Sequence, residues 1–146
     1  MRKINLIALI CYYLLIGNLQ ANTEISIKKY LEKNNIEKSS TQIYLLNRCS
    51  AIYAYASAVI LKTDTANSKK FIEIANNLLL KSVEIRVIEN KEKFETSQKK
   101  AESERKSLFD NYINEGKKNW EKNNSYFKGS YISEDLSICT KLVEDK

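Results

Sequence analysis

The scarcity of residues that interrupt helices constrains this chain more than any other feature of its sequence. Its 146 residues include no proline and three glycines, of which only Gly116 and Gly129 lie beyond residue 21. A protein built from β-strands needs turn residues about every 8–12 positions, and glycine and proline are prominent among them. The sequence therefore predicts an all-α protein. Its length suits a single domain with its own hydrophobic core.

The first 21 residues have the layout of a secretory signal peptide. Arg2 and Lys3 form a basic start, an uncharged apolar run covers residues 4–16, and the segment ends on a small residue, Ala21. We expect cleavage after Ala21 and export to the periplasm or the cell exterior, with residues 22–146 as a single helical-bundle domain. An uncleaved membrane anchor is the alternative. Residues 4–17 would span only about 21 Å as a helix, against roughly 30 Å of hydrocarbon in a bilayer.

The spacing of apolar residues predicts an up-and-down bundle of four to five helices. Helices are expected from residue 23 to about 33, from residue 40 or 41 to about 61, from about residue 67 onward, and from residue 133 to the end. The third is apolar over most of its circumference, which is typical of the most buried helix. Residues 83–87 alternate as a strand would, but no hairpin partner is in view, so we expect helix there. The charged segment 90–119 either continues the third helix or folds back as a fourth.

Cys49 and Cys139 are the two cysteines that remain beyond residue 21, because Cys11 lies in the signal segment. Both fall on the predicted inward face of a helix, and export places them in an oxidising compartment. We therefore expect a Cys49–Cys139 disulfide. The bridge would enclose about 90 residues and stabilise the fold by roughly 4–5 kcal/mol. The alternative is a catalytic thiol, which needs a neighbouring base.

The chain contains no histidine, which removes the base of Cys-His and Ser-His-Asp sites and the commonest zinc ligand. It also lacks the motifs G-x-G-x-x-G, G-x-x-x-x-G-K-[ST] and H-E-x-x-H. The acidic pairs Glu92/Glu95 and Glu102/Glu104 are expected on a solvated face, since a glycosidase pair needs a cleft. We predict no catalytic residue, no metal site and no cofactor.

Arg48 and Asp135 are a candidate structural ion pair. Arg48 adjoins Cys49, and Asp135 lies about one helical turn before Cys139, so a disulfide would bring the two charges near each other. The interpretation that the sequence favours places Asp135 at the N-terminus of its own helix, behind Ser133.

Aromatic residues supply the candidate interface. Tyr44 and Tyr55 lie beside the cysteine helix, and Tyr55 is expected to face outward or to touch another helix. In the C-terminal third, where a polar linker is expected over residues 120–131, lysines alternate with four rings: Trp120, Tyr126, Phe127 and Tyr131. This pattern suits the stacking of single-stranded nucleic acid or contact with an anionic membrane surface. The simpler interpretation is that Trp120 and Phe127 tuck under the linker.

These features predict a small exported helical protein, and most directly a non-enzymatic module that binds another protein or a second copy of itself. An accessory of the membrane surface or cell envelope, acting through the basic and aromatic C-terminal third, is the alternative. An enzyme of an unrecognised type comes third. The formal net charge is +6, yet export makes nucleic acid an unfavourable partner.

Overall fold

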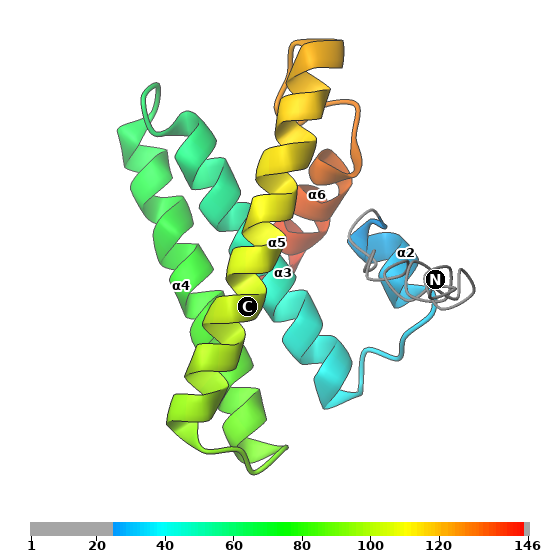
Figure 1. Cartoon of the computed structure of the whole chain (residues 1–146), viewed down its shortest axis with the longest axis vertical. Helices are drawn as coiled ribbons and strands as arrows, with labels where there is room; N and C mark the ends of the chain where they lie inside the picture. The colour runs from blue at the N-terminus through cyan, green and yellow to red at the C-terminus, as the bar shows by residue number, and fades with distance from the viewer. Residues whose placement is uncertain (1–24, 145–146) are drawn as a thin grey trace, which may run out of the picture.

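The computed structural model describes residues 25–144, which form five helices packed together (Figure 1). The helices are α2 (Ile27–Leu31), α3 (Ser39–Ile60), α4 (Thr65–Ile88), α5 (Phe94–Asn123) and α6 (Tyr131–Glu144). From α3 to α6 the chain runs alternately up and down, and the short α2 lies to one side near α6. The predicted all-α bundle is confirmed. The predicted signal peptide lies outside the described residues.

Polar side chains set several helix ends. Ser26 precedes α2 and accepts a hydrogen bond from the Lys29 amide, and Asp64 precedes α4 and accepts one from the Asn67 amide at 3.0 Å. Such caps satisfy amide groups that have no partner within the first turn of a helix. The last helix starts two residues earlier than predicted, at Tyr131 instead of Ser133, and the hydroxyl of Ser130 accepts a hydrogen bond from the Ile132 amide.

The charged segment after residue 89 folds back as a separate helix, which settles one of the open alternatives. Residues 89–93 make the turn, with Lys91 in the left-handed region at φ 57°. The new helix, α5, continues to Asn123, so the first four residues of the predicted linker are helical. Residues 83–87 lie within α4, so the strand alternative is wrong.

The core is centred on α3, and the expectation that the helix starting near residue 67 would be the most buried is wrong. α3 contacts α4, α5 and α6, and its buried residues include Cys49, Ala51, Ile52 and Ala56. Small side chains let neighbouring helices approach α3 on several sides. α4 packs against α3 and α5, and its outer face leaves Ile72, Leu80 and Ile88 exposed. None of the helices within residues 25–144 is long and apolar enough to cross a membrane.

Candidate functional site

The predicted disulfide is present and joins the middle of the bundle to its last helix. Cys49 on α3 and Cys139 on α6 are bonded, their Cα atoms are 5.3 Å apart, and both side chains are fully buried. A bonded and buried cysteine offers no thiolate to a substrate. The cysteine helix is therefore a structural centre of the fold.

Beside the disulfide, Arg48 and Asp135 form a buried ion pair. Two guanidinium nitrogens of Arg48, Nη2 and Nε, donate to Asp135 Oδ2 at 2.6 and 2.9 Å. The other carboxylate oxygen, Oδ1, accepts a hydrogen bond of 2.6 Å from the Ile27 amide at the start of α2. The favoured interpretation, that Asp135 interacts with the N-terminus of its own helix, is wrong. Its carboxylate instead accepts hydrogen bonds from the N-terminus of α2 and from the side chain of Arg48.

Tyrosines complete this polar cluster. The hydroxyl of Tyr112 on α5 donates to Asp135 at 2.7 Å, and Arg48 Nη1 donates to the hydroxyl of Tyr44 at 2.6 Å. The guanidinium also lies 5.6–5.9 Å from the ring centres of Tyr44, Tyr112 and Tyr131, within the range of cation–π attraction. α2, α3, α5 and α6 thus meet at one charged centre.

Burial dominates the electrostatics of this centre. It raises the pKa of the Tyr112 hydroxyl well above its ordinary value. Burial also raises the pKa of the Asp135 carboxyl, and the charge of Arg48 and the Ile27 amide oppose that effect. The charged atoms are enclosed and already hydrogen-bonded to one another, so what this arrangement can do chemically is hold four helices together.

A second ion-pair network, which sequence reasoning missed, joins α3, α4 and α5. Arg86 Nη2 donates to both carboxylate oxygens of Glu104, at 2.6 and 2.7 Å, and Asn47 donates to the same carboxylate at 2.6 Å. Glu92 accepts a hydrogen bond of 3.1 Å from Lys100. Two members of the acidic pairs, Glu92 and Glu104, therefore bind cations of the fold. Arg86 within an otherwise apolar stretch was the available signal.

Of the two α3 tyrosines proposed for an interface, Tyr44 and Tyr55, the second is unavailable. Its ring is buried against Tyr112 and Phe127, and its hydroxyl donates to the Tyr126 carbonyl at 3.0 Å. The expectation that it touches another helix is confirmed, and the outward alternative is wrong. Tyr44 is half-buried and packs on Tyr30, with ring centres 4.0 Å apart.

The aromatic residues of the C-terminal third divide between core and surface. Phe127 and Tyr131 are half-buried. Trp120 is 45% exposed and Tyr126 is 37% exposed, and their rings stack with centres 4.6 Å apart. Trp120 therefore does not tuck under the linker as the simpler interpretation required, whereas Phe127 does pack against the core.

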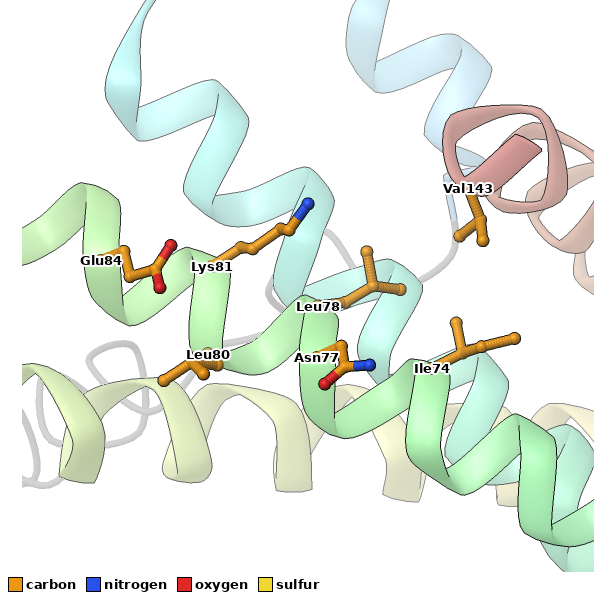
Figure 2. Close-up of a pocket in the computed structure, with 7 residues that line it drawn as sticks. All are labelled: Ile74, Asn77, Leu78, Leu80, Lys81, Glu84 and Val143. Carbon is orange, nitrogen blue, oxygen red and sulfur yellow. The ribbon is translucent and has the colours of Figure 1, made fainter. Parts of the chain in front are cut away.

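The described surface also carries an apolar region on α4, which we call the Leu80 surface. Its hollow has a volume of about 290 Å³, and Figure 2 shows the residues around it: Ile74, Asn77, Leu78, Leu80, Lys81, Glu84 and Val143. The side chains of Ile74 and Leu78 from α4 and of Val143 from α6 converge on the space between these two helices. Leu80, 50% exposed, also lines a smaller hollow against α5 and so forms the ridge between the two.

Within residues 25–144 no group of three histidine, cysteine, aspartate or glutamate side chains is placed to hold a metal ion. No protein-family model matches the chain, and no curated protein or solved structure matches it either.

Proposed function

We propose that this protein is a small exported helical module that acts by binding, with the Leu80 surface as its binding surface and a second copy of the chain as its occupant. The observation that carries this proposal is that the same surface offers both a projection and a hollow. It combines a projecting apolar side chain, Leu80, with an apolar hollow beside it. A two-fold interface places the same patch on both partners, so each patch must supply both projection and hollow.

The charges on this surface favour an antiparallel arrangement of the two α4 helices. Lys81 and Glu84 lie within it, and neither side chain has a hydrogen bond or ion pair with another described residue. Two parallel α4 helices related by a two-fold axis would set Lys81 against Lys81 and Glu84 against Glu84. An antiparallel pair centred between these positions instead sets Lys81 of each copy beside Glu84 of the other, which forms two equivalent ion pairs.

Charge reversal tests the dimer and its orientation together. Lys81→Glu and Glu84→Lys each replace two attractive contacts with two repulsive ones, so each variant should self-associate at least several-fold more weakly than the natural chain. A mixture of the two variants restores both attractions and should form a mixed dimer in sedimentation equilibrium. Lys99→Glu and Glu95→Lys, exposed positions on α5, are the matched controls and should leave the dimer unchanged.

Two results would contradict this proposal. One is a natural chain that stays monomeric up to about millimolar concentration, where even an association free energy of about −4 kcal/mol would produce dimers. The other is a mixture of Lys81→Glu and Glu84→Lys that associates no better than either variant alone. Leu80→Asp tests the apolar contact of the proposed dimer. It places a charge where the interface would exclude water, so this variant should not form the dimer.

Export is the second part of the proposal, and the disulfide supports it. A buried Cys49–Cys139 bond is typical of proteins that reside in oxidising compartments. The basic start and apolar run within residues 1–21, which are typical of a secretory signal peptide, also support export. Intact mass spectrometry of the protein from its native host should give a chain that starts at Asn22. A chain that starts at Met1 and remains with the membrane would favour the anchor alternative.

A further inference from the structure

The end of α5 and the loop 124–130 form an exposed end of the bundle, which we call the aromatic tip. It carries four lysines and two exposed rings: Lys117, Lys118, Trp120, Lys122, Tyr126 and Lys128. In Figure 1 this end, drawn in amber, projects beyond the start of α6. α4 begins at the same end of the bundle as the aromatic tip. Leu80 lies in the second half of α4, so the Leu80 surface is well separated from the tip.

Buried groups hold the loop of the aromatic tip in one shape. The Asn119 side chain, 3% exposed, donates to the carbonyls of Ser125 and Lys128 at 2.8 and 2.6 Å. The Tyr55 hydroxyl donates a hydrogen bond to the Tyr126 carbonyl, and Ser125 Oγ accepts a hydrogen bond of 3.0 Å from the Lys128 amide. The loop is therefore ordered before any partner arrives, which lowers the entropy cost of binding.

This ordered loop sets Trp120 and Tyr126 against each other at the surface. Their ring planes are 19° apart, so the rings cover each other on one face and remain exposed on the other. Tryptophan and tyrosine with this mixture of apolar ring and polar edge concentrate at the interface between lipid headgroups and hydrocarbon. Because the two rings already face each other, no base can enter between them as it would in a single-strand nucleic-acid site.

The charge around these rings is strongly positive. Residues 117–128 contain four lysines and a single acidic residue, Glu121, and all four lysines are exposed. Lys118 and Lys122 are four residues apart on α5 and therefore share one face of the helix, and Lys117 lies roughly 100–140° around the helix from them. None of the four forms an ion pair with another described residue.

We propose that the aromatic tip docks end-on against an anionic lipid bilayer, with Trp120 and Tyr126 at the interface and the lysines against lipid headgroups. Each lysine near such a surface strengthens binding about fivefold. Phosphate-bearing lipids supply the negative charge, and the flat interface fits a projecting end better than it fits a groove. This function is independent of the Leu80 surface and goes beyond the proposed self-association.

Trp120 is the only tryptophan of the chain, so its fluorescence reports on the tip directly. The test uses the chain from Asn22 onward, which contains all five described helices, with vesicles of phosphatidylcholine alone or with about one third phosphatidylglycerol. We expect co-sedimentation and a blue shift of Trp120 emission with the anionic vesicles only, both weakened by high salt. The variant Lys117→Gln/Lys118→Gln/Lys122→Gln should bind roughly 100-fold more weakly, by the contribution of three lysines.

A control with the same change in net charge separates the tip from general attraction. Lys38→Gln/Lys93→Gln/Lys99→Gln removes three exposed lysines at or near the starts of α3 and α5, and this variant should bind within a few-fold of the unaltered chain. Both helices begin at the end of the bundle opposite the tip. Equal weakening by both triple variants would overturn the proposal, and so would vesicle binding without any shift in Trp120 emission. Binding to heparin or single-stranded DNA in the absence of vesicle binding would assign the tip to a soluble polyanion instead. None of these changes alters Leu80, Lys81 or Glu84, so failure here leaves the self-association test intact.

Discussion

Arg48 and Asp135 form their 2.6 Å ion pair directly beside the disulfide that joins the same two helices. Arg48 precedes Cys49 on α3, and Asp135 lies about one turn before Cys139 on α6. The covalent and the ionic link therefore act at neighbouring levels of one helix–helix contact. The hydrogen bond from the Ile27 amide to Asp135 adds α2 to the same point.

Removal of one partner of this pair should be far more damaging than removal of both. Asp135→Leu leaves the guanidinium of Arg48 buried without its counter-charge, and Arg48→Met leaves the carboxylate in the same position. Each single change should lower the free energy of unfolding by about 3–5 kcal/mol. The double variant should lose much less than the sum of the two, because no unpaired charge remains. Urea unfolding of the four chains with the disulfide intact measures this coupling.

The exposed pair Lys106–Asp110 on α5 is the matched control. The same cycle there should give a coupling of less than about 0.5 kcal/mol, because both charges stay in water. Additive losses at Arg48 and Asp135 would show that the ion pair contributes nothing specific.

The disulfide should resist modification and contribute strongly to stability. Both sulfurs are fully buried, so an alkylating reagent without reductant should label neither Cys49 nor Cys139 in the folded protein. The variant Cys49→Ala/Cys139→Ala should lose up to about 4–5 kcal/mol, since the bond restricts a long loop of the unfolded chain. Peptide mapping after alkylation and urea unfolding give the two measurements. Ready labelling of both residues would contradict the bond.

Local patterns were sufficient to predict the helical class and the cysteine pair. The helical class followed from the lack of proline and the spacing of apolar residues, and the cysteine pair followed from two inward-facing cysteines in a chain with a predicted export signal. The role of Asp135 was not visible in this way. Its carboxylate acts on the first residue of α2, more than 100 positions away, and only the packing of α2 against α6 brings the two together.

The same limit applies to burial and to the candidate surfaces. Periodicity predicted that Tyr55 would face outward or touch another helix, but it could not show that α5 covers that side with Gly116. It likewise could not show that α4 would face solvent around Leu80. A helix that is apolar on most sides can be central or can carry a binding surface, and only its number of packed neighbours decides between these roles.

Gly116 should be required by its contact with Tyr55. A Cβ atom at this position would overlap the Tyr55 hydroxyl and lie 2.8 Å from Cζ of the same ring. Alanine is intrinsically better than glycine inside a helix by about 1 kcal/mol. The overlap opposes this gain, because overpacking of a core typically costs about 1–3 kcal/mol. Gly116→Ala should therefore destabilise the natural chain in urea unfolding.

The sign of this effect should reverse when the ring is removed. In a Tyr55→Leu background the overlapping atoms are absent, and Gly116→Ala should then stabilise the protein by up to about 1 kcal/mol through helix propensity alone. A Gly116→Ala change that has the same effect in both backgrounds would contradict the close contact as its cause.

The buried tyrosines should make the fold sensitive to alkaline pH. Burial raises the pKa of Tyr112 and of Tyr55 above the ordinary value of 10.0. Below that value both folded and unfolded chains keep these protons, and the contribution to stability is fully present. Above it the unfolded chain loses protons that the folded chain still holds. The free energy of unfolding should then fall by up to about 1.4 kcal/mol per pH unit for each tyrosine.

Phenylalanine at these positions separates the titration from the packing. Tyr112→Phe and Tyr55→Phe each lose a hydrogen bond, which lowers stability at every pH. Each variant should also show a smaller fall in the free energy of unfolding per pH unit above pH 10, because one ionisable hydroxyl has been removed. Urea unfolding at intervals from pH 8 to about 11.5 measures both effects. If the slopes of the two variants equal that of the natural chain, groups other than Tyr55 and Tyr112 govern the alkaline loss of stability.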